Sequence, residues 1–383
     1  MKVSPLPKGW RLVKFGDLVR KINDRVDPDS SGISRYVAGE HMDSDNLKIT
    51  RWGTVGDGYL GPAFTMRFQP GQILYGSRRT YLRKVAVADF VGICANTTFV
   101  LESKSEELLQ EFLPHVMSTE RFHEYSISKS KGSVNPYINF VDLNDYEFAL
   151  PPIAEQHRII ELLSTIDLNK DSFYMARKAA IAQKNALMNR WIFEEEQGVL
   201  GKLEDYASLN PGGVTLSEED PFIPMDALPL LQRHPEYFEQ KGTRGGIRAK
   251  AGDVLFARIT PCLENGKLCQ VPLEIDACGG STELIVIRTK GEVSQDLLFH
   301  WATFEAIRLR AANLMIGTTG RQRLMAKDLG SLPFRKLSDH QESQLVESLN
   351  QIEKTVGLLD LQLRECKVLE YSLREYLLAG RNV

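Results

Sequence analysis

Basic side chains gather in three stretches of the sequence that contain almost no acidic residues. Residues 67–88 and 306–327 each hold five Lys or Arg and no Asp or Glu, and residues 241–261 hold five against Asp253 alone. The whole chain carries a net charge of −3, so these stretches are where a basic field can form. A local basic field can bind phosphate groups on a near-neutral protein. The alternative is three solvated surfaces without a ligand.

Patterns that would indicate catalysis are all incomplete. Residues 135–137 (Asn-Pro-Tyr) lack one proline of the box found in amino-group methyltransferases, and no glycine-rich cofactor loop precedes them. Residues 317–321 lack the Gly-Lys-Ser/Thr ending of a phosphate-binding loop, and residues 239–241 lack the further acidic ligands of a metal-dependent nuclease. Cys262 and Cys269 have no second pair to complete a zinc site. We therefore predict that the chain is not an enzyme by itself and that it holds no metal or cofactor.

The sequence repeats itself once, at offsets between 181 and 188 residues. Residues 70–75 (Pro-Gly-Gln-Ile-Leu-Tyr) correspond to residues 251–256 (Ala-Gly-Asp-Val-Leu-Phe), and residues 94–98 (Cys-Ala-Asn-Thr-Thr) correspond to residues 278–282 (Cys-Gly-Gly-Ser-Thr). Each match is short, but the matches keep one order and a nearly constant spacing. A repeat of this length predicts two copies of one structural plan.

Apolar residues at seven-residue steps predict a long helix at the end of each copy. Ile159, Ile166, Phe173, Ala180 and Leu187 each correspond, 186 residues on, to another apolar residue. A heptad pattern of this length is typical of a coiled coil. We expect the following residues to form the pairing seam: Ile159, Ile166, Phe173, Leu187, Leu345, Ile352, Leu359, Leu363 and Leu373.

Local signals indicate where these two helices begin. Pro151 and Pro152 precede the first helix, and Ser338 with Gln341 forms a capping-box pattern before the second. Because a globular segment separates the helices, they most simply pair antiparallel. The alternative is that each helix packs on its own lobe.

We therefore predict an α+β fold with two pseudo-repeated α/β lobes and an antiparallel coiled coil of two long helices. The predicted divisions are residues 1–150 and 199–336 for the lobes and residues 151–198 and 337–383 for the helices. The lobes mix short strands, such as residues 72–75 and 284–287, with helices, such as residues 295–310.

Composition indicates a folded protein of the cytoplasm. The 383 residues suffice for two domains, and 43% hydrophobic with 25% charged residues is an ordinary globular balance. No run of 18 apolar residues is present, and the first residues lack the apolar core of a signal peptide. Five cysteines without framework spacing fit a reducing compartment.

Several short motifs stand in order along the two halves of the chain. In the first half they are residues 7–10, 71–78, 94–99 and 150–156, and in the second half residues 252–258, 317–320 and 339–341. Two lobes of this kind, each followed by a long helix, make the chain similar to the specificity subunit of type I restriction–modification systems. The resemblance covers the whole chain. One departure is residues 335–338, which stand where the family usually has a second Pro and a Glu-Gln.

The resemblance implies two target-recognition domains, each reading one half of a split site on double-stranded DNA. It also implies helices that dock two methyltransferase subunits, which in turn can recruit restriction subunits. Adenine methylation and cleavage would then belong to the partners, with S-adenosylmethionine, ATP and Mg as their cofactors.

In such a protein, Lys and Arg supply affinity for phosphates, whereas groove-facing Arg, Asn, Gln and Ser supply sequence choice. Arg can bind guanine bidentately, which Lys cannot match. The alternative is that these arginines pair with carboxylates of their own lobe. The predicted DNA contacts are Arg78, Arg79, Tyr81, Arg83, Lys129, Lys131, Ser133, Asn135, Arg244, Arg258, Thr260, Thr318, Thr319, Arg321, Gln322 and Arg323.

The basic loops differ between the two copies, with Arg78 and Arg79 in one and Ile259 and Thr260 at the equivalent place in the other. A shared scaffold with unlike loops predicts an asymmetric, bipartite target. A structural scaffold that does not bind DNA, whose helices bind only protein, remains the alternative, and an isolated nuclease is a third.

Overall fold

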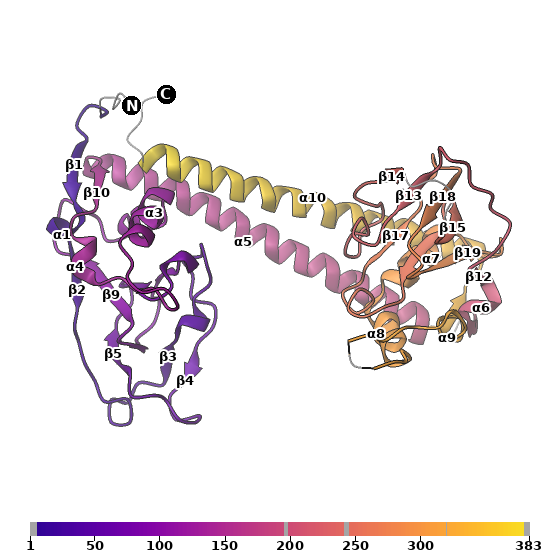
Figure 1. Cartoon of the computed structure of the whole chain (residues 1–383), viewed down its shortest axis with the longest axis horizontal. Coiled ribbons are helices and arrows are strands. Elements are labelled where there is room, and N and C mark those ends of the chain that lie inside the picture. Colours follow the sequence, from indigo (N-terminus) through magenta and orange to yellow (C-terminus); the bar gives the residue numbers. More distant parts are fainter. Residues whose placement is uncertain (1–5, 195–197, 241–244, 319, 379–383) are drawn as a thin grey trace. The chain divides into compact units, whose positions relative to one another are not determined.

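The computed structural model describes residues 6–194, 198–240, 245–318 and 320–378. The chain divides into two compact units. Unit 1 consists of residues 1–173 and 362–383, and unit 2 of residues 174–361. Both boundaries fall inside long helices, so each unit contains one lobe together with a segment of both helices (Figure 1). The four divisions expected from the sequence place their boundaries at the helix ends instead, and they stay a prediction.

Unit 1 is built on two four-stranded sheets and one strand pair. The first sheet has the order β2-β9-β6-β7 and is antiparallel throughout, and the second has the order β4-β3-β8-β5 with a parallel β3–β8 pair. β1 pairs antiparallel with β10. The strands are β1 (Arg11–Lys14), β2 (Val19–Ile22), β3 (Arg35–Val37), β4 (Gly53–Thr54), β5 (Phe64–Phe68), β6 (Ile73–Gly76), β7 (Val85–Val87), β8 (Gly92–Ala95), β9 (Thr98–Ser103) and β10 (Glu147–Leu150).

Unit 2 repeats this topology strand for strand. Its sheets have the orders β12-β19-β16-β17 and β14-β13-β18-β15, the parallel pair is β13–β18, and β11 pairs with β20. The predicted duplication is confirmed, down to the position of the parallel pair. The strands are β11 (Val199–Lys202), β12 (Ala207–Leu209), β13 (Pro221–Ile223), β14 (Glu239–Gln240), β15 (Ile247–Lys250), β16 (Val254–Ala257), β17 (Leu268–Gln270), β18 (Ala277–Gly280), β19 (Leu284–Thr289) and β20 (Pro333–Lys336).

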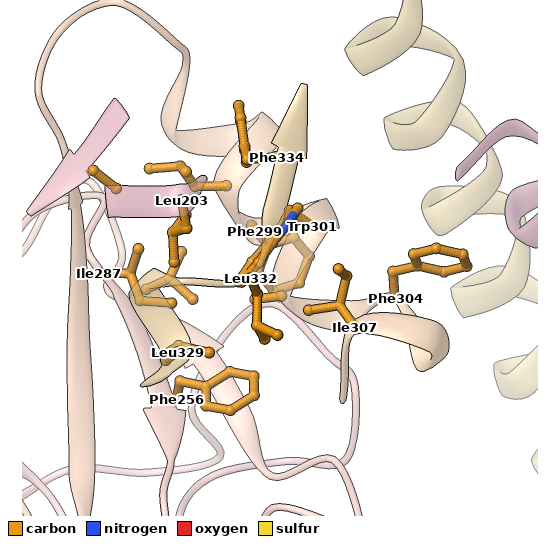
Figure 2. Packing of buried hydrophobic residues seen from close by; sticks show 14 of the residues in the cluster. Leu203, Phe256, Ile287, Phe299, Trp301, Phe304, Ile307, Leu329, Leu332 and Phe334 are labelled. Carbon is orange, nitrogen blue, oxygen red and sulfur yellow. The ribbon is translucent and has the colours of Figure 1, made fainter. Parts of the chain in front are cut away.

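Short helices cover the sheets in both units. Unit 1 contains α1 (Phe15–Leu18), α2 (Leu113–Met117), α3 (Glu120–Ser128) and α4 (Phe140–Leu143), and unit 2 contains α6 (Leu203–Tyr206), α7 (Gln295–Thr303), α8 (Glu305–Asn313) and α9 (Ala326–Gly330). In the core of unit 2, strand and helix side chains pack around Trp301 and Phe334 (Figure 2). The indole Nε1 of Trp301 donates to the carbonyl oxygen of Pro333 at 2.9 Å, so the buried ring leaves no polar atom unpaired.

The two long helices are α5 (Ile153–Asn189) and α10 (Asp339–Leu378). α5 continues into a short π-helical segment, Arg190–Glu194. α5 begins directly after Pro151 and Pro152, as predicted. Ser338 caps α10 reciprocally, because its Oγ accepts from the backbone N–H of Gln341 at 3.4 Å and its own N–H donates to Oε1 of Gln341 at 3.2 Å. The departure from the family motif at residues 335–338 therefore leaves the helix start intact.

In each unit the segments of α5 and α10 lie side by side and run antiparallel (Figure 1). Lys170 of α5 pairs with Glu370 of α10 in unit 1. In unit 2, Arg177 lies further along α5 but pairs with Asp360, which lies earlier on α10, at 2.6 Å. The predicted antiparallel pairing of the helices is confirmed.

The predicted seam residues all face inward to some degree. Ile159, Ile166 and Ile352 are buried, and the other six, Phe173, Leu187, Leu345, Leu359, Leu363 and Leu373, are half-buried. Within unit 1, Leu373 packs against the cluster that contains Ile159, and within unit 2, Leu187 and Leu345 pack against the main core.

A buried polar side chain near the start of each long helix holds the lobe segment before it. Gln156 accepts from the backbone N–H of Leu109 at 2.9 Å and donates to the carbonyl oxygen of Glu107 at 2.7 Å. Glu342, 186 residues on, accepts from the backbone N–H of Ser294 at 2.6 Å. The Gln of the motif at residues 150–156 therefore ties its helix to the lobe.

Three buried histidines make the stability of the fold depend on pH. Burial, helped by nearby cationic side chains, lowers the pKa of His115, His123 and His300 to about 4. In the unfolded chain the pKa is near 6.5, so the unfolded state takes up protons first as the pH falls. The contribution of these histidines to the free energy of unfolding is fully present above about pH 6.5 and is lost as the pH falls towards 4. The slope is at most about 1.4 kcal/mol per pH unit for each histidine.

We expect the thermal midpoint of the protein to fall between pH 7 and pH 5 and His115→Gln to reduce that fall. Calorimetry across this pH range measures both. His340→Gln, at an exposed position on α10, is the matched control and should leave the pH dependence unchanged. A midpoint that stays constant from pH 7 to pH 5 would contradict the assignment.

Candidate nucleic-acid interface

Two predicted loops of unit 1, far apart in the sequence, form a single surface. The backbone N–H of Arg79 donates to the carbonyl oxygen of Pro136 at 2.6 Å, and that of Ile138 donates to the carbonyl oxygen of Ser77 at 2.9 Å. The hydroxyls of Thr80 and Ser130 lie 2.8 Å apart. We call residues 77–83 and 129–138 loop pair 1.

The first of these loops is held in an unusual backbone conformation. A single 3₁₀ turn, Thr80–Leu82, lies between Arg79 and Arg83, whose φ angles are 50° and 53°. The left-handed region costs a residue with a Cβ roughly 1–2 kcal/mol, so such a turn persists only where its surroundings hold it. The hydrogen bonds to the second loop supply that support, and the side chain of Tyr81 at the turn is half exposed.

The basic residues of loop pair 1 fall into two groups. Arg78 and Arg79 are exposed, and within the described part of the chain neither has an ion-pair partner. Arg83 instead pairs with Glu120, the first residue of α3, and Lys131 contacts both carboxylate oxygens of Asp142 at 3.0 Å. The Lys131 ammonium holds the pKa of the Asp142 carboxyl below its usual range.

The remaining predicted residues of loop pair 1 are polar and solvent-facing. Lys129 lies over the ring of Tyr125, with its Nζ 5.6 Å from the ring centroid, and Ser133 and Asn135 are exposed.

Unit 2 joins the equivalent loops by the same backbone contacts. The N–H of Thr260 donates to the carbonyl oxygen of Gln322 at 3.1 Å, and that of Leu324 donates to the carbonyl oxygen of Arg258 at 2.8 Å. Ile316 and Arg323 exchange two backbone hydrogen bonds of 2.9 Å. We call residues 258–264 and 316–324 loop pair 2; residue 319 in it is not described.

The bridging residues correspond across the repeat. Tyr137 bridges to Arg78 and Lys131 in unit 1, whereas Arg323 bridges to Ile259 and Ile316 in unit 2. The two loop pairs therefore share a backbone plan and differ in side chains.

The residues of loop pair 2 that were predicted to contact DNA also fall into two groups, some with a side-chain partner in the described structure and some without. Arg321 and Thr318 are exposed, and the described structure gives the Arg321 side chain no partner. Arg323 pairs with Glu283, and the hydroxyl of Thr260 donates to Glu264 at 3.0 Å. Arg258 and Gln322 are half-buried, and Nη2 of Arg258 lies 3.6 Å from the Met325 sulfur. Arg244 and Thr319 lie outside the described residues.

Three carboxylates that pair with basic residues of the loop pairs were not predicted from the sequence: Glu120 and Asp142 in unit 1 and Glu283 in unit 2. The structure pairs Arg83, Lys131 and Arg323 with these carboxylates. For these three residues it therefore agrees with the alternative stated above, that basic residues pair with acids of their own lobe. Their contact with DNA stays a prediction. Of the three acids, only Asp142 belongs to a sequence motif that the repeat shows, because Asp142-Leu143 corresponds to Asp328-Leu329.

The long helices also carry exposed apolar residues that are not part of the predicted pairing seam. Large apolar side chains are exposed on α5 and α10 in both units, some at seven-residue steps that differ from the seam. They are Ile153, Leu162, Leu168, Val368, Leu369, Tyr371 and Tyr376 in unit 1, and Tyr174, Met175, Leu358 and Leu361 in unit 2. Among the residues that the structure describes, no helix is both long and apolar enough to cross a bilayer.

Comparison with known proteins agrees with this arrangement. Residues 7–183 match the family model described as "Type I restriction modification DNA specificity domain". The chain is 26% identical over 202 residues to the type I restriction enzyme EcoDI specificity subunit of Escherichia coli. The chain resembles the specificity subunits of type I restriction–modification systems. The match to the Escherichia coli specificity subunit covers 52% of this chain and 44% of that relative, so the chain matches less than half of the relative's length.

Two solved structures share the fold over nearly the whole chain. The first is described as "Structural basis underlying complex assembly and conformational transition of the type I R-M system". Its TM-score is 0.60 at 19% identity, and the match covers 98% of this chain and 99% of that chain. The other, a type I restriction–modification S subunit from M. genitalium, has a TM-score of 0.60 at 14% identity and covers 100% of this chain and 98% of that chain. At these identities the likeness concerns the fold alone.

Proposed function

We propose that this chain is the DNA-reading specificity subunit of a type I restriction–modification complex and is not catalytic by itself. The observation that carries this proposal is the loop pair of each unit, in which two loops distant in sequence are joined by backbone hydrogen bonds and present exposed arginine. A rigid backbone with free cationic side chains is what recognition of base edges requires, because phosphate contacts position a protein and base contacts select the sequence.

The free arginines are the best candidates for base contacts. Arg78 and Arg321 are exposed and have no carboxylate partner in the described residues, so contact with DNA would not require either to leave an ion pair. The guanidinium can bind O6 and N7 of guanine together, at about 1–3 kcal/mol of discrimination for each such pair. Lys129, Ser133 and Asn135 of loop pair 1 and Thr318 and Gln322 of loop pair 2 would supply further polar contacts.

We infer that the target is bipartite and asymmetric. In loop pair 1 the free arginines stand in the first loop, at Arg78 and Arg79, whereas in loop pair 2 Arg321 stands in the second. Two surfaces with the same backbone and different chemistry would select different half-sites. α5 and α10 run through both units, so their length would set the gap between the half-sites.

The exposed apolar residues of α5 and α10 support docking of partner subunits. Isolated exposed apolar residues are common. On α10, however, Leu361 and Val368 lie seven residues apart, as do Leu369 and Tyr376, so each pair shares one face of the helix. By resemblance to the family, the partners would be two methyltransferase subunits, and through them restriction subunits. Those partners would bring S-adenosylmethionine, ATP and Mg to the complex. The same helix surface also fits the alternative of a scaffold that binds protein but not DNA.

Arg78→Ala should remove about 1–3 kcal/mol of discrimination at one base of one half-site, because a bidentate contact is lost. Mapping the methylated positions in the genome of a host carrying each variant measures this change. Arg20→Ala is the matched control, since Arg20 is an exposed arginine of unit 1 that pairs with Glu102 outside both loop pairs. A target profile identical in the two variants would count against the assignment of Arg78.

The salt dependence of DNA binding separates the proposal from the scaffold alternative. A DNA reader releases counterions, so its affinity for duplex DNA falls steeply with rising salt. A scaffold shows no affinity, or an affinity that salt does not change.

Deleting one heptad from each helix should shorten the accepted gap and leave both half-sites unchanged. Residues 171–177 of α5 and 360–366 of α10 are suitable, because this removes the Arg177–Asp360 ion pair as a whole and keeps the seven-residue register. Methylation mapping of the host reads the gap and the half-sites together. Altered half-sites with an unchanged gap would refute the role of the helices as a spacer.

Val368→Glu should abolish partner docking while the chain stays folded. Val368 is 66% exposed on α10 and lies outside the pairing seam, so the new charge disturbs the outer face of the helix only. Co-purification of methyltransferase subunits with the tagged chain measures docking, and circular dichroism measures the fold. Gln351→Glu adds the same charge at an exposed polar position of α10 and is the control. A full complex with the Val368 variant would show that this face does not bind the partners.

A further inference from the structure

The ion pair between Arg323 and Glu283 has a geometry suited to base recognition. Nε of Arg323 donates to Oε2 of Glu283 at 3.1 Å, and Nη2 donates to Oε1. Both bonds therefore use the edge of the guanidinium that carries Nε and Nη2. Of its five N–H groups, the three at the Nη1–Nη2 end are left without a partner in the described structure, and that end is the one that can contact guanine O6 and N7 together.

The backbones of both residues are fixed. Arg323 exchanges two hydrogen bonds of 2.9 Å with Ile316, which closes the loop between them. Glu283 lies between β18 and β19, its carbonyl oxygen accepts from the N–H of Arg258 at 3.0 Å, and its N–H donates to Oγ of Ser281 at 3.3 Å. Glu283 therefore touches both loops of loop pair 2, one through its backbone and the other through its carboxylate.

The two side chains differ in their access to solvent. Arg323 is 60% exposed, whereas Glu283 is 23% exposed. The carboxylate is thus the more buried member of the pair and the guanidinium the more exposed one. An exposed ion pair contributes only about 0.2–1 kcal/mol to stability, so its main effect is on where the guanidinium points.

Resting on the function proposed above, we propose that Glu283 is a positioning residue that orients Arg323 to read a guanine in the half-site of unit 2. Glu283 restricts the rotamers of Arg323 before DNA arrives, which lowers the entropy cost of the bidentate contact. Its negative charge at the same time repels phosphates of non-target DNA. The two effects have opposite signs on target and non-target affinity, and both raise selectivity.

The device is specific to unit 2. In unit 1 the equivalent backbone bond runs from Ser77 to Thr97 at 3.1 Å, and Tyr137 stands in the place of Arg323. Loop pair 1 therefore has neither the carboxylate nor the arginine at these positions. A change at Glu283 should alter one half-site and leave the other as it is.

The test uses the full chain, tagged and isolated from its host with whatever subunits accompany it. Wild type and variants each select from a pool of random duplex DNA. Their affinities are then measured on the duplex selected by the wild type and on a scrambled duplex of the same length and composition.

Glu283→Gln should lower the affinity for the selected duplex roughly three- to tenfold, because Arg323 regains rotamer freedom. It should raise the affinity for the scrambled duplex by up to roughly fivefold, because one negative charge is gone. The selected motif should weaken at one base of one half-site. Arg323→Lys should abolish preference at that base and keep the affinity for the scrambled duplex, since it retains the charge and loses the fork.

Glu292→Gln is the matched control, because Glu292 pairs with Lys336 at 2.7 Å in unit 2 outside loop pair 2. The proposal is overturned if Glu283→Gln shifts both affinities in the same direction, or behaves as Glu292→Gln does. It is also overturned if Arg323→Lys keeps the full base preference, a result that does not depend on how well Glu283→Gln folds. A wild-type assembly that selects no motif would instead refute the proposed function itself.

Discussion

The backbone hydrogen bonds that join two distant loops in each unit are the constraint on which the candidate interface depends. In unit 1 they connect residues 77–79 with residues 136–138, and in unit 2 residues 258–260 with residues 322–324. Backbone bonds do not depend on side-chain identity, so the loops can change their chemistry without losing their shape. The backbone bond from Arg79 to Pro136 also holds Arg79 in the left-handed region, with a φ of 50°.

The paired helices are part of the lobes and are not appended to them. Met188 and Leu349 lie in the main core of unit 2, and Ile159 and Leu163 lie in the main core of unit 1. Their burial is shared with strands and short helices of the same unit, so a lobe cannot turn on its helix segment without opening its own core.

Much of the fold could be predicted from the sequence, because duplication and heptad spacing are periodic signals. Both copies share strand order and the parallel pair, and the helices run antiparallel as expected. The loop contacts could not be predicted, since Arg79 and Pro136 are joined by backbone atoms that no residue type specifies. Glu283 was missed for a related reason: it lies 40 residues from Arg323, and a single Glu before a strand carries no signal of its own.

The two loop pairs carry different side chains on the same backbone plan. Arg78 has Ile259 as its counterpart, and Tyr137 has Arg323, so the charged and apolar members of the bridged pair exchange places between the units. The bridge survives this exchange because it is made of backbone atoms. Each copy can therefore place its cationic side chain on a different loop while strands β6 and β16, which precede the first loops, keep the same pairing within their sheets. Side chains of either loop pair can therefore differ while the strands beneath them keep their pairing.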